Sequence, residues 1–224
     1  MNIAIVLSGG TGIRLGSQIP KQYIEVGGKT IISYCLEVLD QCFQIDAIQI
    51  VADESWHDVI KKTQMSKFKG FSKAGINRQL SIFNALEDVK QYATEEDVVI
   101  IHDAARPCVT EEILTDLINT CREHDGALPV LPMKDTVYIS KDGVIISSLL
   151  DRSQIFAGQA PEAFVFGKYY DANMRLLPEK ILSINGSTEP AILAGMDVAM
   201  IPGDENNFKI TTMQDLERFQ QLRG

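Results

Sequence analysis

The feature that most constrains the fold is the stretch 3–23, where an apolar run meets a glycine-rich turn. Residues Ile3 to Leu7 are apolar on both faces of a strand, which is typical of the first strand of a parallel sheet covered by helices. The turn after this strand combines three glycines with two later cations: Gly9, Gly10, Gly12, Arg14 and Lys21. Because open α/β sheets bind ligands at the carboxyl ends of their strands, this turn is predicted to form a binding site.

The chemistry of the turn suits phosphate groups. Glycines let backbone N–H groups approach an anion closely, Arg14 offers a fork of donors, and Lys21 supplies a mobile charge. Two common phosphate-loop motifs fit poorly, because G-x-x-x-x-G-K-[ST] is absent and Leu15 replaces the third glycine of G-x-G-x-x-G. A tight strand-to-helix turn with surface cations would show the same pattern, so the assignment depends on residues further along the chain.

The composition is that of an ordinary globular protein. The chain has 224 residues, 23% of them charged and 45% hydrophobic, enough for one large α/β domain or two small ones. No linker, repeat or low-complexity tract divides it, so residues 1–224 are expected to form a single domain. A net charge of −9 gives binding to nucleic acid or to a membrane surface no electrostatic support.

The four cysteines have neither C-x-x-C spacing nor paired histidines nearby, which argues against a zinc site or a redox pair: Cys35, Cys42, Cys108 and Cys121. We interpret them as buried thiols in a reduced compartment. The chain starts directly in a strand, and it has no apolar run of about eighteen residues, the length that marks a membrane-spanning helix. A cytoplasmic location is therefore expected.

The rest of the chain alternates strand and helix patterns, which predicts a mostly parallel sheet flanked by helices. Thr110 and the pair Thr212 and Asp215 provide helix caps, and the segment after Met65 is expected to be a loop. The expected strands are 45–51, 98–101, 127–131 and 198–201. The expected helices are 30–42, 55–65, 77–92, 110–124, 167–177, 191–194 and 212–222.

Residues 135–152 interrupt this alternation. Two strand-like stretches, Val137 to Ser140 and Val144 to Leu149, are joined by a turn signal, Lys141-Asp142-Gly143. A hairpin of this kind has no obvious place in a parallel sheet. It is predicted to project as an arm and to bury its apolar residues against a partner subunit.

Asp103 and Lys209 are the strongest candidates for chemistry outside the turn. Asp103 follows a buried strand, where it suits either a magnesium ion bridging triphosphate oxygens or a turn cap. Lys209 suits a third cation at the same edge of the sheet, with Asp204 or Glu205 as a second metal-facing carboxylate, but taken alone it also fits a solvated surface charge. His102 has no nucleophile or second ligand nearby and is interpreted as structural.

Taken together, the motifs resemble the cytidylyltransferases that act on polyol phosphates, the family of 2-C-methyl-D-erythritol 4-phosphate cytidylyltransferase and ribitol-5-phosphate cytidylyltransferase. The resemblance covers nearly the whole chain. It rests on GGTGIRLGSQIPKQY at 9–23, GINRQLSIFNAL at 75–86, HDAARP at 102–107, KDT at 134–136, Asp151-Arg152, GQAPEAF at 158–164 and NFKITT at 207–212.

The resemblance implies a Rossmann-like α/β fold, a homodimer formed through the arm, and transfer of CMP from CTP to a polyol phosphate with Mg²⁺ as cofactor. The implied catalytic residues are Arg14, Lys21 and Lys209, and Asp103 is the implied metal ligand. The implied nucleotide-binding residues are Ser8, Gly9, Gly10, Thr11, Gly12, Gly75, Arg78, Ser81 and Asp103. The implied substrate-binding residues are Arg106, which also resembles a support for its loop, and Asp135, Thr136 and Arg152, the last reaching into the neighbouring subunit's site.

Departures from the family pattern leave the acceptor open. Ala160-Pro161-Glu162 stands where the methylerythritol enzymes usually read T-P-Q, and residues 187–191 stand where T-D-[DE]-A is common. Gly158-Gln159 resembles the ribitol-type sequences. The acceptor can therefore be methylerythritol 4-phosphate or ribitol 5-phosphate, with products for isoprenoid or for cell-surface chemistry.

Three alternatives remain at this point. A sugar-1-phosphate nucleotidyltransferase would also have a glycine loop with Arg and Lys, but we would expect it to lack HDAARP and the arm. A metal-dependent glycosyltransferase would need Asp-x-Asp, which the chain does not contain. A catalytically inactive nucleotide-binding protein would have no reason to retain Arg14, Lys21, Asp103 and Lys209 together.

Overall fold

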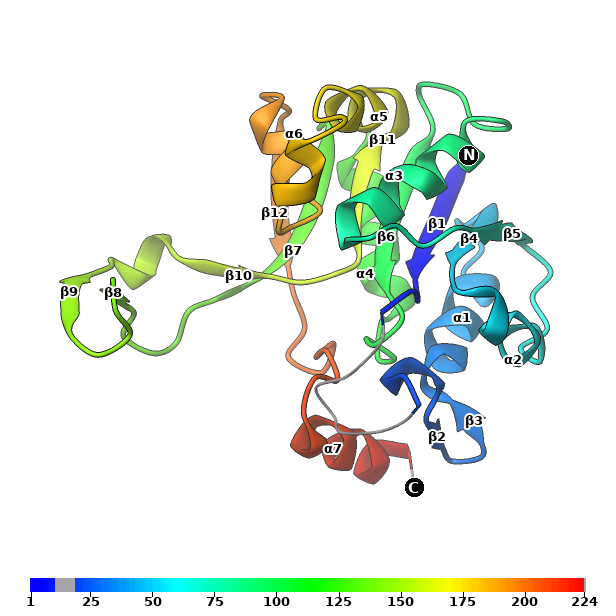
Figure 1. The fold of residues 1–224 in the computed structure, drawn as a ribbon, viewed down its shortest axis with the longest axis horizontal. Helices are drawn as coiled ribbons and strands as arrows, with labels where there is room; N and C mark the ends of the chain where they lie inside the picture. The colour runs from blue at the N-terminus through cyan, green and yellow to red at the C-terminus, as the bar shows by residue number, and fades with distance from the viewer. Residues whose placement is uncertain (11–18, 224) are drawn as a thin grey trace.

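A twisted sheet runs through the middle of the computed structural model, which describes residues 1–10 and 19–223 (Figure 1). Its strand order is β10-β7-β11-β6-β1-β4-β5. The eighth strand, β12, lies off this path and pairs parallel with β7. The strands are β1 (Asn2–Leu7), β4 (Ala47–Val51), β5 (Phe68–Ser72), β6 (Val98–Asp103), β7 (Gly126–Pro132), β10 (Phe156–Gly158), β11 (Glu162–Val165) and β12 (Val198–Pro202).

The sheet is mostly parallel, as the alternation of strands and helices predicts. β1 pairs parallel with β4 on one side and with β6 on the other, and β5 extends the parallel part beyond β4. β11 is antiparallel to both β6 and β7, and β10 is antiparallel to β7. The chain therefore builds outward from β1 in one direction and then returns to β6 on the other side, which creates a switch point between β1 and β6.

Helices cover both faces of the sheet because successive side chains of a strand point to opposite faces. Ala4 and Val6 of β1 pack on the face covered by α1 (Ile31–Gln41) and α4 (Glu111–Thr120). Ile3 and Ile5 pack on the face covered by three other helices: α3 (Arg78–Val89), α5 (Phe166–Met174) and α6 (Glu189–Leu193). The two apolar layers explain why the first strand is apolar on both faces.

A third apolar cluster joins α7 (Met213–Arg223) to α1 and to the small hairpin of β2 (Glu25–Val26) and β3 (Lys29–Thr30). The ring of Tyr34 meets Phe219 edge to face at 5.0 Å between centroids. The cap expected at Thr212 is confirmed: the Asp215 carboxylate accepts from the Thr212 N–H at 2.8 Å, and the Thr212 hydroxyl accepts from the Asp215 N–H at 3.2 Å. This packing anchors the segment that carries Lys209.

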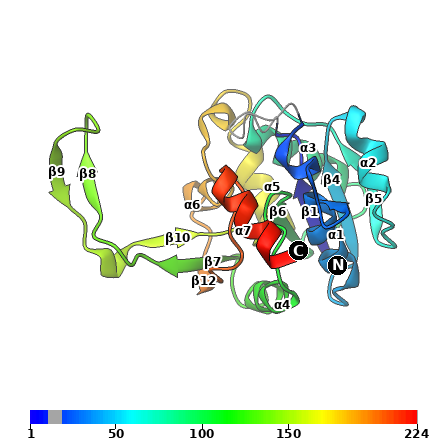
Figure 2. The same cartoon turned by 90° about the horizontal axis from the view of Figure 1, so that it is seen from below.

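The expected arm is present and projects well away from the body, as Figures 1 and 2 show. β8 (Tyr138–Ser140) and β9 (Ile146–Leu149) form an antiparallel pair. Gly143 has a positive φ of 74° in the turn between them, a conformation that glycine adopts without steric cost. β7 and β10 form the stem of the arm, with Pro132 opposite Phe156.

Three expectations need correction. The segment after Met65 contains β5 rather than a loop only, and the helix expected at 55–65 is limited to α2 (His57–Lys61), preceded by a 3-10 turn. β11 was not expected, although it is buried and contacts both β6 and β7. β5 was missed because Lys69 and Gly70 break its apolar pattern, and β11 because it begins with a glutamate directly after Pro161, which gives no strand signal.

None of the helices in 1–10 and 19–223 has the length and apolar character needed to cross a membrane.

Candidate active site

The main cavity lies at the carboxyl edge of the parallel strands and has a volume of about 560 Å³. Leu7 of β1 is in register with Val51 of β4 and with Asp103 of β6, and all three side chains line the cavity. The register places the glycine turn beside Asp103, because the turn follows β1 and Asp103 is the last residue of the neighbouring parallel strand β6. This is the position that the sequence predicts for a ligand.

The first part of the glycine turn lines one wall of the cavity. Gly9 and Gly10 line it directly, and Ser8 is buried beside it. The Gln22 side-chain amide donates to the carbonyl oxygens of Ser8 and of Gly10, at 2.8 Å each. The Ser8 hydroxyl donates to the Tyr23 hydroxyl at 2.7 Å. The turn is thus held in shape from behind by the two residues that follow Lys21.

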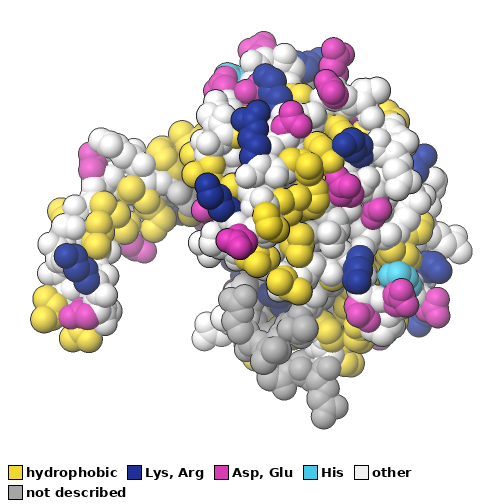
Figure 3. All heavy atoms as spheres, turned by 45° about the horizontal axis from the view of Figure 1, so that its top comes forward, with side chains coloured by type: hydrophobic (Ala, Val, Ile, Leu, Met, Phe, Trp, Pro, Cys, Tyr) yellow, Lys and Arg dark blue, Asp and Glu magenta, His cyan; other side chains and the backbone are white. Residues whose placement is uncertain are grey.

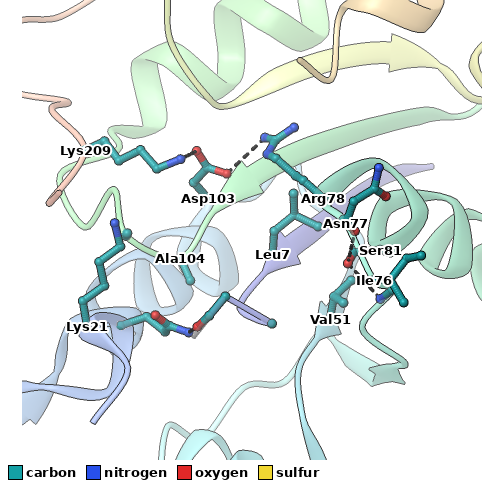
Figure 4. A pocket seen from close by; sticks show the side chains of 15 residues that line it. Leu7, Lys21, Val51, Ile76, Asn77, Arg78, Ser81, Asp103, Ala104 and Lys209 are labelled. Atoms are coloured by element: carbon teal, nitrogen blue, oxygen red, sulfur yellow. Dashed lines mark hydrogen bonds and ion pairs between the residues drawn. The ribbon is translucent and has the colours of Figure 1, made fainter. Parts of the chain in front are cut away.

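Three residues that the sequence assigns to the same turn, Thr11, Gly12 and Arg14, lie outside the described residues. Lys21 opens the 3-10 turn Lys21–Tyr23 and lines the cavity. Figure 4 shows its side chain and that of Lys209 entering from different segments.

The amino end of α3 forms the opposite wall. Asn77 caps the helix, because its side-chain oxygen accepts from the Leu80 N–H at 2.8 Å. The Ser81 hydroxyl accepts from the Gly75 N–H and donates to the Asn77 carbonyl, at 2.9 Å each. A Cβ on Gly75 would lie 2.7 Å from the Ser81 nitrogen, so glycine is required there. The amino end of α3 is therefore a closely packed wall of the cavity.

Asp103 pairs with two cations across the cavity (Figure 4). Its Oδ1 accepts from Arg78 Nη2 at 3.0 Å and its Oδ2 from Lys209 Nζ at 2.8 Å. Burial alone would raise the pKa of the Asp103 carboxyl, but the charges and hydrogen bonds of Arg78 and Lys209 outweigh it and hold that pKa well below its usual range. Asp103 is therefore ionised at any physiological pH.

Arg106 lies behind this ion pair and supports the loop that carries Lys209. Its Nη1 donates to the Asn207 carbonyl at 2.6 Å, and burial lowers the pKa of its guanidinium. His102 is completely buried, its Nε2 lies 3.1 Å from the Arg106 carbonyl, and burial lowers its pKa to about 4. Arg106 therefore contacts the segment that carries Lys209 and does not line the cavity. Its implied role in substrate binding and the structural role of His102 stay predictions.

The pocket thus combines a glycine turn, a helix amino end, Lys21, and Asp103 between two further cations. Compared with protein families, residues 2–222 match the model of IspD, 2-C-methyl-D-erythritol 4-phosphate cytidylyltransferase. The chain belongs to this family. It is a cytidylyltransferase, which is a class of nucleotidyltransferase.

The relatives that resemble this cytidylyltransferase over nearly its whole length are named for one of two acceptors, 2-C-methyl-D-erythritol 4-phosphate or ribitol 5-phosphate. A 2-C-methyl-D-erythritol 4-phosphate cytidylyltransferase of Geobacter metallireducens is 37% identical over 221 residues, covering 95% of this chain and 93% of the relative. A ribitol-5-phosphate cytidylyltransferase of Streptococcus agalactiae is 30% identical over 227 residues, covering 99% and 95%. The crystal structure of the 2-C-methyl-D-erythritol 4-phosphate cytidylyltransferase of Francisella tularensis superimposes with a TM-score of 0.82 at 25% identity, covering 98% of this chain and 99% of the other.

Five of the described residues predicted for the site of this cytidylyltransferase do not line its cavity. Ser8 and Arg106 are packed beside it, and the other three lie on the arm. Asp135, Thr136 and Arg152 are exposed at the base of the arm. Arg152 Nη1 donates to the Lys134 carbonyl at 2.8 Å, which links the two sides of the stem. Because the arm leads away from the body, these side chains do not join the other predicted residues within one chain.

A magnesium ion would find one carboxylate in the pocket, that of Asp103. The described part of the chain contains no group of three or more His, Cys, Asp or Glu side chains that could hold a metal by itself. Magnesium is commonly bound by one or two carboxylates together with substrate phosphates, so Asp103 fits an ion that enters with a triphosphate. Asp204 and Glu205, considered above as a second metal-facing carboxylate, do not line the cavity, and Glu205 pairs with Lys134.

Several residues that shape the site were not predicted. Gln22 and Asn77 act on the two walls, and Gln159 and Asn207 hold the loop before Lys209. Each lies inside a motif that carries the family resemblance, but a neutral amide carries no signal of charge or metal preference. Gln22 could have been found from its position in the sequence, because it directly follows Lys21, the predicted catalytic lysine.

Proposed function

We propose that this protein transfers CMP from CTP to the phosphate of a small polyol phosphate, releasing pyrophosphate, with Mg²⁺ as cofactor. The observation that carries the proposal is that one cavity at the carboxyl edge of the sheet is lined by Lys21 and by Asp103 with its two ion-pair partners, Arg78 and Lys209. A cavity of about 560 Å³ is within the range of small-molecule sites.

The two walls of the cavity suit the two ends of a nucleoside triphosphate. The turn at Gly9 and Gly10, with Lys21, suits the phosphates, because it combines close backbone approach with a cation. The wall made by Gly75 and Ser81 suits the base and ribose. The exposed side chain of Ile76 borders the same wall and offers an apolar surface for a base.

The proposed reaction is a direct displacement at the α-phosphorus of CTP. An oxygen of the acceptor phosphate forms the new P–O bond, the bond from the α-phosphorus to the bridging oxygen of pyrophosphate breaks, and no covalent enzyme intermediate forms. Lys21 and Lys209 would lower the repulsion between the two anions and stabilise charge at phosphorus. A magnesium ion held by Asp103 would neutralise further triphosphate charge.

The ion pairs at Asp103 have a role in this scheme. Arg78 and Lys209 are held in the cavity by a carboxylate, so the two cations are already oriented before a ligand enters. Such preorganisation reduces the cost of orienting charge at the moment of reaction. An incoming triphosphate would compete with Asp103 for Arg78 and Lys209. A metal ion would compete with Arg78 and Lys209 for Asp103.

The arm suits a homodimer in which each site is completed by the partner subunit. Figure 3 shows hydrophobic side chains along the arm. Those that are exposed are Tyr138, Ile139, Val144, Ile145, Ile146, Leu149 and Phe156. Exposed apolar groups in such number favour burial against another protein surface. In the dimer, Asp135, Thr136 and Arg152 would bind the acceptor phosphate at the neighbouring site.

We also propose a cytoplasmic location. The four cysteines are free thiols, as expected in a reducing compartment, and burial raises the pKa of Cys35 and of Cys121 to about 12.

The test is pyrophosphate release with CTP and Mg²⁺ against methylerythritol 4-phosphate, ribitol 5-phosphate and other small polyol phosphates, with ATP, GTP and UTP in place of CTP as controls. We expect rapid release with CTP and one acceptor, and loss of release in Lys21→Ala with an unchanged melting temperature. CTP binding without release for every acceptor would contradict the proposed activity. Near-normal turnover of Lys21→Ala would contradict the proposed role of that residue.

A further inference from the structure

The segment that carries Lys209 is attached to the stem of the arm as well as to the body. We call residues 203–209 the connector; it joins β12 to the segment before α7 (Figure 1). Its end is fixed to the body, because the Ile210 N–H donates to the Ala105 carbonyl at 2.9 Å and the Lys209 ammonium donates to Asp103 at 2.8 Å. Its beginning contacts the stem side, where the arm leaves the sheet, and α7, where Arg218 Nη2 donates to the Glu205 carbonyl at 3.3 Å and to the Asn206 side-chain oxygen at 3.4 Å.

Gln159 is the main contact between the stem and the connector. It directly follows β10 and is buried. Its Nε2 donates to the Asp204 carbonyl at 2.9 Å, and its Oε1 accepts from the Asp204 N–H at 3.1 Å. One side chain therefore pairs with both polar groups of one connector residue, as a neighbouring strand would.

Two further contacts surround this pairing. The Gly203 N–H donates to the Val130 carbonyl of β7 at 2.9 Å. A Cβ on Gly203 would lie 2.6 Å from Gln159 Oε1, so a side chain there would displace the Gln159 amide. On the exposed side, Lys134 pairs with Glu205. Both strands of the stem, β7 and β10, therefore contribute to holding the connector.

Asn207 carries the constraint toward the lysine. It is fully buried, its Nδ2 donates to the Ala160 carbonyl at 2.8 Å, and its own carbonyl accepts from Arg106. Lys209 follows two residues later. A displacement of the connector at Asp204 would therefore move the backbone from which the Lys209 ammonium reaches Asp103.

We propose that Gln159 is a positioning residue that sets the location of the Lys209 ammonium and couples it to the stem of the arm. The proposal rests on the proposed catalytic role of Lys209. In this arrangement Gln159 touches no substrate. It acts through the connector, so its contribution to the reaction requires that Lys209 be present.

The test is a double-mutant cycle in kcat with CTP, Mg²⁺ and the preferred acceptor. Gln159→Met keeps the side-chain length and removes both hydrogen bonds with Asp204. We expect it to lower kcat by roughly 10-fold in the native background and by less than about 2-fold in a Lys209→Ala background, because residues that act as a unit are non-additive. KM for CTP is expected to change by less than about 3-fold, since the walls of the cavity that suit the nucleotide remain.

A control at another glutamine and a second variant at Gln159 make the result interpretable. Gln91→Met makes the same substitution at an exposed glutamine outside the cavity and is expected to leave kcat unchanged in both backgrounds. Gln159→Glu keeps the volume and the acceptor but places a carboxylate oxygen against the Asp204 carbonyl, and should give the same non-additive pattern. Thermal melts of each variant report whether it folds.

An equal loss of kcat from Gln159→Met in both backgrounds would overturn the inference and leave Lys209 in its proposed role. If Lys209→Ala alone has native kcat, the proposed role of Lys209 fails, and the inference fails with it. If neither Gln159 variant folds, the amide serves the core and is not a positioning device, which would also contradict the proposal.

Discussion

At the residue scale, neutral amides organise much of the pocket, and Gln22 shows how. Its side chain is buried and donates to two carbonyl oxygens on either side of Gly9. Those bonds fix the orientation of the Ser8 and Gly10 carbonyl groups in the turn. Because Gln22 directly follows Lys21, the same 3-10 turn brings Lys21 to the cavity and holds the glycine turn in shape.

Replacing Gln22 by Leu should weaken nucleotide binding. Two hydrogen bonds of about 0.5–1.5 kcal/mol each would be lost, so we expect KM for CTP to rise roughly 10-fold while kcat changes less. Steady-state kinetics over a range of CTP concentrations measures this, with Gln91→Leu as the exposed control. An unchanged KM for CTP would show that the turn keeps its shape without Gln22.

Glu162 gives a prediction about pH. Burial raises the pKa of its carboxyl, and the charge of Arg78 offsets this only in part. The folded state therefore binds the Glu162 proton more tightly than the unfolded state, so this group lowers the free energy of unfolding as pH rises above the ordinary glutamate pKa. An amide at this position avoids the buried charge and still accepts a hydrogen bond from the Thr188 hydroxyl, which lies 2.9 Å from Glu162 Oε2.

Glu162→Gln should accordingly unfold at a higher urea concentration than the native chain at pH 7.5. The difference should shrink toward zero as pH falls through the ordinary glutamate pKa of about 4.3, because glutamate then becomes protonated in both states. Urea titrations at four or five pH values measure it. A variant that is less stable than the native chain at pH 7.5 would contradict this account of Glu162.

At the element scale, the sequence predicted the parts whose signal is local. The β1 run, the capped helices and the arm with its Lys141-Asp142-Gly143 turn all have short-range patterns, and the structure contains them. β11 lacked such a signal, because a four-residue strand between β6 and β7 is specified by its neighbours. For the same reason, the sequence could place Asp103 at the sheet edge but could not show that Arg78 and Lys209, 25 and 106 residues away, pair with it.

A substitution on the arm should change dimerisation without changing the thermal stability of the body. Ile145 lies at the arm tip with 69% of its surface exposed, and Ile192 on α6 has a similar 65%. Ile145→Lys should convert dimers to monomers while the melting temperature of the body stays within a few degrees, because surface substitutions usually change stability by less than about 0.5 kcal/mol. Ile192→Lys should remain dimeric. Sedimentation velocity distinguishes the two, and a dimeric Ile145→Lys would count against the arm as the interface.

At the scale of the whole molecule, a chain of net charge −9 concentrates cations at one edge of its sheet. The acidic remainder repels other polyanions, which favours small phosphate substrates over nucleic acid. In the proposed dimer, each active site would combine the cavity of one body with three proposed acceptor residues on the partner's arm.

Mixing inactive variants tests that joint site. Lys21→Ala and Arg152→Ala protomers should each have low activity as homodimers. After exchange of subunits, half of the dimers are mixed and each contains one site with both residues, so about a quarter of native activity should return, as expected for a two-fold dimer. Mixed dimers demonstrated by mass spectrometry that show no recovery would mean that Arg152 acts within its own chain or not at all.

The most direct test of the central claim is to follow the phosphorus atoms. ³¹P NMR of CTP, Mg²⁺ and the preferred polyol phosphate with the native protein should show the acceptor monophosphate converted into a diphosphate diester, with one pyrophosphate released for each. Lys209→Ala should slow this conversion by roughly 10²–10³, the scale of losing one preorganised charge-stabilising group. Pyrophosphate that appears together with free CMP, or a native rate in Lys209→Ala, would contradict transfer of CMP by this site.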